Sequence, residues 1–208
     1  GFHITPSYLA EYEAVAAKAS VSLTTQESHC HQFIAERAGW ASVLEDAKQA
    51  GDLSLRPIHG DPKVNNLMMD AESGKAIALV DLDTVKPGLV HYDIGDCLRS
   101  GCNPLGEETR EPEAVVFDLE RCGAILSGYL ETAGQTLSEA DHRYLFDAIR
   151  LIPFELGLRF FTDHLKGNSY FKADRAGHNL DRALVQFALT ASIEAQENEI
   201  RELLDQLR

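Results

Sequence analysis

The stretch that most constrains this chain is the polar run at residues 58–67, which is set between apolar residues. It contains His59, Gly60 and Asp61, and Asn66 follows five residues after the Asp. The Asp61 carboxylate is suited to accept a proton from a hydroxyl, and the Asn66 amide oxygen is a ligand that Mg²⁺ accepts. The tripeptide alone is as typical of a turn as of a site. Its spacing to Asn66 indicates a site.

A second acidic stretch reinforces this interpretation. An apolar run at 76–80 predicts a strand that ends at Asp81, whose carboxylate would be a further Mg²⁺ ligand. We expect strand 53–58 to pair with strand 67–69 in one small β-ribbon, which brings the loop and Asp81 together. Asp83 has two open roles, a metal contact or a cap of the following turn, and the structural role is favoured.

The rest of the chain is patterned for helices, so the predicted fold class is α+β and mostly α. Thr5 is the expected N-cap of the first helix, and Pro153 is expected to kink or split a later one near Ile152. Segment 85–91 is predicted as a loop and segment 99–112 as an exposed loop, with Asp96 as a surface acid. The helical segments are predicted at about 26–38, 40–50, 93–98, 113–133, 138–166 and 179–207.

Composition excludes several classes of protein. The net charge of −14 argues against a nucleic-acid or anionic-membrane surface, because either needs clustered cations. No apolar run reaches the length of a membrane span, and the four cysteines are predicted to be free thiols. His29, Cys30 and His31 are adjacent and do not share one helix face, so a helix turn is favoured over a zinc site.

The combined motifs resemble the C-terminal lobe of the aminoglycoside phosphotransferase and choline kinase superfamily. They are most similar to its N-acetylhexosamine 1-kinase-like branch. The residues that carry this resemblance are 61–66, 80–88 and 92–96, with further similarity at 157–163 and 170–172. It implies a lobe of a protein-kinase-like fold that transfers phosphate from ATP with Mg²⁺.

The resemblance also implies roles for single residues. Asp61 would be the catalytic base, and Asn66 and Asp81 the metal ligands. His59, Asp83 and Asp93 would support the loops that carry these groups.

Arg159 and Tyr170 would line a sugar pocket, as the matching residues do in the hexosamine kinase branch. The alternative for Arg159 is an exposed ion pair with Asp163, four residues further along a helix.

We therefore expect residues 1–208 to form a single lobe and the N-terminal, mostly β lobe of such kinases to be absent from this chain. The isolated chain is expected to be inactive and to bind ATP weakly. The predicted activity of the whole protein is phosphorylation of a sugar hydroxyl, in the cytoplasm. Alternatives are an aminoglycoside or amino-alcohol kinase, or a non-catalytic binding module. A lobe without its partner should expose a face through which it could self-associate.

Overall fold

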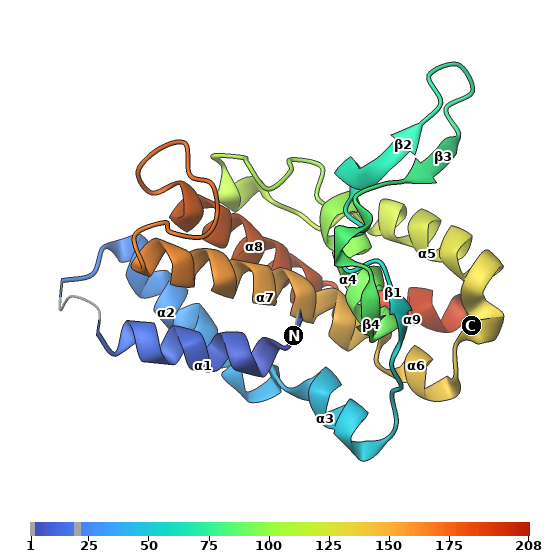
Figure 1. Ribbon diagram of the computed structural model, residues 1–208, viewed down its shortest axis with the longest axis horizontal. Coiled ribbons are helices and arrows are strands. Elements are labelled where there is room, and N and C mark those ends of the chain that lie inside the picture. Colours follow the sequence, from blue (N-terminus) through green and yellow to red (C-terminus); the bar gives the residue numbers. More distant parts are fainter. Residues whose placement is uncertain (1–2, 19–21) are drawn as a thin grey trace.

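A long apolar helix, α7 (Leu145–Leu165), lies at the centre of the molecule and organises the other elements. The structure is a computed structural model, and it describes residues 3–18 and 22–208. Figure 1 shows α7 packed against α8 (His178–Ala195), α4 (Val90–Gly101) and α1 (Thr5–Ala16). Most side chains of α7 are buried, because it is apolar on nearly all sides.

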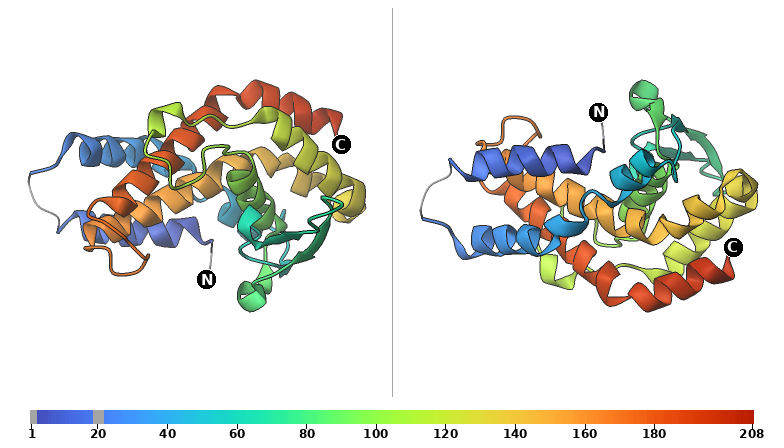
Figure 2. Two further views of the ribbon diagram at one scale, coloured as in Figure 1. Left: turned by 90° about the horizontal axis from the view of Figure 1, so that it is seen from above. Right: turned by 90° about the horizontal axis from the view of Figure 1, so that it is seen from below.

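The other helices surround this core, as two further views show (Figure 2). They are α2 (Thr25–Arg37), α3 (Val43–Ala50), α5 (Leu119–Ala133), α6 (Glu139–Arg143) and α9 (Glu197–Gln206). Two helices begin near their predicted positions at a capping box, in which two side chains each accept the backbone N–H of the other residue. The pairs are Thr24 with Glu27 at α2 and Ser138 with Asp141 at α6. Gly51 ends α3 in a left-handed conformation at φ 83°.

Four short strands form two separate two-stranded antiparallel sheets. One pairs β1 (Arg56–Ile58) with β4 (Lys86–Gly88), and the other pairs β2 (Leu67–Met69) with β3 (Ala76–Leu79). The β2–β3 hairpin projects from the helical body (Figure 1). The predicted fold class, α+β and mostly α, is confirmed.

The predicted strand pairing is wrong. Strand 53–58 is shorter than expected and does not pair with 67–69, and segment 85–91 contains β4 and the start of α4 rather than a loop. The cause lies at Asp81, which has a left-handed backbone at φ 67° and is followed by a 3₁₀ turn. This conformation turns the chain back, so that β4 reaches β1.

Pro153 does not split α7, contrary to one of the two outcomes predicted for it, and helical structure continues through Ile152. The break falls earlier, at Tyr144 between α6 and α7. A proline inside a helix costs about 3 kcal/mol. Burial of its neighbour Phe154 and of most of α7 offsets that cost. The predicted helix 179–207 is also two helices, which meet at Gln196.

Two helix starts differ from the prediction. Ile4, not Thr5, is the N-cap of α1, because the Thr5 hydroxyl donates to Glu155 Oε2 at 2.6 Å instead. The predicted start at 113 is also wrong. Helix α5 begins at Leu119, where the Asp118 side chain accepts a backbone hydrogen bond.

The loop predicted at 99–112 is confirmed only from residue 102 onward, where the chain leaves the helix and is largely exposed up to residue 111, and the surface position predicted for Asp96 is wrong. Helix α4 continues to Gly101, and Asp96 and Arg99 are both buried on it. Their side chains pair at 2.7 Å, and Arg99 also contacts Glu107 at 3.2 Å. This pairing explains the burial, because a buried charge needs an opposite charge.

The cysteines, the helices and the acidic and histidine side chains bear on the disulfide, membrane and metal sites that the sequence argued against. All four cysteines are free thiols, as predicted. Within the described ranges no helix is long and apolar enough to cross a membrane, and no cluster of three or more His, Cys, Asp or Glu side chains is placed to hold a metal ion. At the rejected zinc motif, Cys30 is buried and the His31 ring contacts the Tyr12 hydroxyl at 2.5 Å.

Candidate active site

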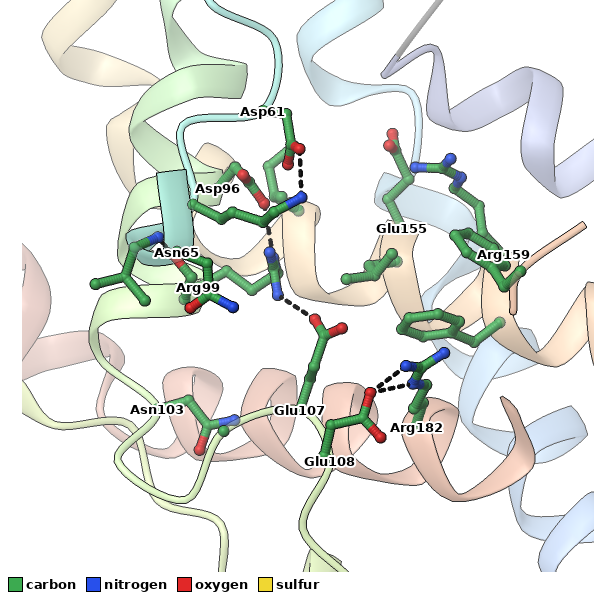
Figure 3. Close-up of a pocket in the computed structure, with 18 of the residues that line it drawn as sticks. Asp61, Asn65, Asp96, Arg99, Asn103, Glu107, Glu108, Glu155, Arg159 and Arg182 are labelled. Carbon is green, nitrogen blue, oxygen red and sulfur yellow. Dashed lines mark hydrogen bonds and ion pairs between the residues drawn. The ribbon is translucent and has the colours of Figure 1, made fainter. Parts of the chain in front are cut away.

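Asp61 lies in the loop between β1 and β2, at the wall of a cavity of about 620 Å³ (Figure 3). The Lys63 ammonium is 2.5 Å from Asp61 Oδ2. Asn66 Nδ2 donates to the Asp61 backbone oxygen at 2.8 Å. The loop therefore presents a carboxylate at the cavity wall, with a cation beside it and an amide that fixes its backbone.

His59 connects this loop to the strand that precedes Asp81. The backbone N–H of Asp61 donates to His59 Nδ1 at 3.3 Å, so this ring nitrogen carries no proton. His59 Nε2 is then the donor to the Val80 carbonyl oxygen at 3.0 Å. A neutral imidazole thus joins the two motifs by one donated and one accepted hydrogen bond.

Asp93, on α4, holds the same loop from behind. Its two carboxylate oxygens accept the backbone N–H groups of His59 at 2.7 Å and of Gly60 at 2.8 Å. Burial raises the pKa of Asp93, and the hydrogen bonds from Gly60 and His59 act in the opposite direction. The carboxylate contacts the loop backbone, as expected for a supporting residue.

Gly60 has to be glycine at this point of the loop. Its φ of 86° lies in the left-handed region, and a Cβ atom there would lie 2.8 Å from the Thr84 carbonyl oxygen. The Thr84 hydroxyl donates to the His59 carbonyl oxygen at 2.7 Å. The loop therefore approaches the turn after Asp81 too closely for any side chain.

The two candidate metal ligands are neighbours through the backbone. The Val80 N–H donates to the Asn66 carbonyl oxygen at 2.9 Å, and Asp81 follows directly. Because Asn66 Nδ2 is directed at Asp61, the amide oxygen is the atom left for a ligand. Asp81 is exposed. Asp83 is also exposed, in the 3₁₀ turn Leu82–Thr84, and its role stays a prediction.

The large cavity brings Asp61 together with Arg159 and Tyr170, although they are far apart in the sequence. The Arg159 guanidinium lies over the Tyr8 ring at 4.9 Å and near the Phe171 ring at 5.4 Å. Tyr170 is 70% exposed. Figure 3 shows Arg159 across the cavity from Asp61.

Comparison with known protein families matches residues 2–125, more than half of the chain, to the phosphotransferase enzyme family (APH). The chain belongs to this family. The match includes the Asp61 loop and Asp81, and it confirms the predicted superfamily, whereas the hexosamine kinase branch stays a prediction. Phosphotransferases of this family generally use ATP and a divalent metal. Asn66 and Asp81 fit such a metal, because both offer oxygen atoms.

A buried carboxylate, that of Asp163, holds the loop that carries Tyr170. Asp163 is only 3% exposed, and it accepts backbone N–H groups of Tyr170 at 2.8 Å and Phe171 at 3.0 Å. It also accepts from the Asn179 side chain at 3.0 Å. The alternative, an exposed ion pair between Arg159 and Asp163, is therefore wrong, because the Asp163 carboxylate is buried and accepts hydrogen bonds from the Tyr170 loop.

Replacing Asp163 with Ala is expected to lower the free energy of unfolding by about 2–4 kcal/mol, because the buried Asn179 side chain and several partly buried backbone N–H groups lose their acceptor. The Tyr170 loop should also become more mobile. Thermal denaturation and hydrogen exchange at residues 169–171 would measure both effects. Asp174→Ala is the matched control, since Asp174 lies on the same loop and its side chain forms an exposed ion pair with Lys172. Equal effects of the two changes would contradict the assignment.

Several residues that line the cavity were not predicted from the sequence. Lys63 could have been noticed as a cation two residues from Asp61, and Glu155 as the one acid in the apolar run 148–158. Arg99 and Asp96 have a helical spacing that predicts a pair. That both side chains are buried could not be predicted from the local sequence, because their burial depends on Glu107 and on packing against α7.

Proposed function

We propose that the protein phosphorylates a hydroxyl of a neutral, polyhydroxylated small molecule, with ATP as the phosphate donor. The supporting observation is that Asp61 shares one cavity with Arg159 and Tyr170. A carboxylate base and hydrogen-bonding groups are thereby placed around one volume, which is large enough for a sugar-sized acceptor.

In this proposal Asp61 accepts the proton of the acceptor hydroxyl as its oxygen attacks the transferred phosphoryl group. The Lys63 ammonium forms an ion pair with the Asp61 carboxylate at 2.5 Å in the resting site. Asn66 and Asp81 would hold Mg²⁺, which neutralises charge that develops on the phosphate oxygens. His59 and Asp93 keep the loop in place during the reaction.

The charges of the cavity support a neutral acceptor. Apart from His3, the cavity wall carries equal numbers of acidic and basic side chains. The five acids are Asp61, Asp96, Glu107, Glu108 and Glu155, and the five cations are Lys63, Arg99, Arg159, Lys172 and Arg182. Several of them already pair with one another. A polycationic aminoglycoside needs a surplus of acids, whereas a sugar needs donors and acceptors of both kinds.

A panel of acceptors tests this proposal. The full-length protein would be assayed with Mg²⁺-ATP and an N-acetylhexosamine, an aminoglycoside and choline in turn, with detection of ADP and of the phosphorylated product. We expect the sugar to be phosphorylated. Phosphorylation of the aminoglycoside or of choline alone would contradict a neutral acceptor, and no product from any of them would contradict the proposed activity.

Replacing Arg159 with Ala is expected to lower kcat/KM for the sugar by about 10- to 100-fold, because a charged hydrogen-bond donor contributes roughly 1.5–3 kcal/mol. The KM for ATP should stay nearly unchanged. Steady-state kinetics with sugar and ATP varied separately would measure the two constants. An effect confined to the ATP constant would reject the acceptor-binding role.

The control for Arg159→Ala is Arg121→Ala. Arg121 is an exposed arginine of α5 that forms a surface ion pair with Asp118 at 3.2 Å. Such a pair contributes little to stability, so this change should leave both kinetic constants as they are.

We further propose that a second, β-rich lobe completes the nucleotide site next to Asp81. Exposed apolar side chains on and after the β2–β3 hairpin support this proposal, since such groups mark interaction surfaces. They are Met68, Met69, Ile77, Leu82 and Val85, each 49–62% exposed. The same surface is where we would expect self-association of the isolated chain.

A further inference from the structure

His3 is a buried histidine that contacts the Asp61 loop from outside the motif. Its ring is stacked on Tyr92, with 5.2 Å between centroids. Nδ1 lies 2.9 Å from Glu155 Oε1, and Nε2 lies 3.2 Å from the Gly60 carbonyl oxygen. The residue just before the N-cap of α1 thus joins α7 to the peptide bond immediately before Asp61.

The two contacts indicate the charge state of His3. A carbonyl oxygen only accepts hydrogen bonds, so Nε2 must carry a proton. A proton on Nδ1 as well makes the ring a cation facing the Glu155 carboxylate. Burial alone lowers the pKa of His3, but the charge and hydrogen bond of Glu155, the Asp96 charge and the Gly60 hydrogen bond together raise the pKa above its ordinary value. His3 and Glu155 therefore form a buried ion pair.

The backbone of His3 gives independent support. Its φ of 62° lies in the left-handed region, which non-glycine residues rarely adopt. Backbone strain of this kind persists only where the surrounding structure enforces it, and it occurs often at functional sites. Here the conformation directs the ring to Glu155 and to the loop.

The peptide between Gly60 and Asp61 is consequently held on both sides. The Gly60 oxygen faces His3, and the Asp61 N–H donates to His59 Nδ1 at 3.3 Å. The Gly60 N–H is held by Asp93 at 2.8 Å. His3 is thus the contact from the helical core that limits rotation of the peptide carrying the base.

We propose that His3 is a positioning residue of the phosphotransfer reaction, which, through the Gly60 carbonyl, holds Asp61 in the orientation that accepts the hydroxyl proton. This inference rests on the proposed function, because it takes Asp61 as the base. Small displacements of a reacting group, on the order of 1 Å, lower a rate about 100-fold. A residue that fixes the base should therefore affect kcat more than substrate binding.

Three variants of the full-length protein separate positioning from simple stabilisation. His3→Ala removes the contact with the loop, and His3→Gln restores a neutral donor of similar reach. Thr5→Val is the matched control, because the Thr5 hydroxyl bonds to the same Glu155 carboxylate at 2.6 Å but is directed at α7 and not at the loop. Melting temperatures would be measured for all three.

We expect His3→Ala to lower kcat about 10- to 100-fold with the KM values for ATP and acceptor changed less than about threefold. His3→Gln should regain much of this loss, and Thr5→Val should keep kcat within about threefold. Hydrogen exchange at residues 59–66 should increase in His3→Ala only. Equal losses of kcat in His3→Ala and Thr5→Val, or unchanged exchange at 59–66 in His3→Ala, would overturn the inference.

The exchange measurement also separates this inference from the proposed function. Wild-type protein without phosphotransferase activity would overturn the proposed function, and with it the positioning role of His3. Active wild-type protein in which His3→Ala leaves kcat and loop exchange unchanged would overturn only the role of His3.

Discussion

Replacing Asp61 with Asn in the full-length protein is expected to lower kcat by about 10²- to 10⁴-fold, the range that general bases typically contribute. Asn keeps the shape of the side chain but cannot take up the hydroxyl proton. The melting temperature should change little, because Asp61 is partly exposed and its backbone contacts to Asn66 and His59 remain. The measurement is turnover at saturating Mg²⁺-ATP and acceptor.

The control for this experiment is Asp83→Asn. Asp83 is an exposed acid in the turn just after Asp81, and the structural role is favoured for it. If turnover of Asp61→Asn stayed close to that of wild type, Asp61 would not be the base. A loss of the same size in Asp83→Asn would contradict the structural role favoured for Asp83, and the loss in Asp61→Asn would then not single out Asp61 as the base.

Replacing Asp93 with Ala should have the second largest effect, on stability as well as on rate. It removes the acceptor of two loop N–H groups, those of His59 and Gly60. We expect a loss of about 2–4 kcal/mol, which corresponds to a decrease in melting temperature of roughly 5–15 °C for a chain of this size. The rate should fall about 100-fold, because the loop that carries the base is no longer held.

Differential scanning calorimetry and steady-state kinetics would measure the two effects of Asp93→Ala. Asp70→Ala is a suitable comparison, since Asp70 also accepts a backbone N–H, from Ser73 at 2.8 Å, but does so in the exposed β2–β3 turn. The predicted role of Asp93 would be refuted by a variant that is destabilised as expected yet turns over at the wild-type rate.

Much of the local structure was predictable from the sequence because it depends on neighbours in the chain. The caps at Thr24 and Ser138 and the stop at Gly51 follow from side chains within three residues or from one permissive glycine. The loop at Asp61 was also recognisable, since its spacing to Asn66 is a property of the sequence. These interactions form wherever such a segment can fold.

Other expectations failed where distant contacts outweighed local preference. The strands are only three or four residues long, so their pattern carries no information on which pairs with which. Pro153 is tolerated inside α7 because the helix is packed on its neighbours. Asp96 and Arg99 looked exposed by composition and are buried, because they neutralise each other next to Glu107.

The sequence by itself determined the chemical groups of the candidate site and their local order, from His59 through Asn66 to Asp81. Only the tertiary structure decided what surrounds them. It brought Arg159 and Tyr170 to the cavity of Asp61, and it joined His3 to Glu155 across 152 positions of the chain. Closing such long separations costs conformational entropy that only packing of the whole core repays, so no short segment of sequence encodes these contacts.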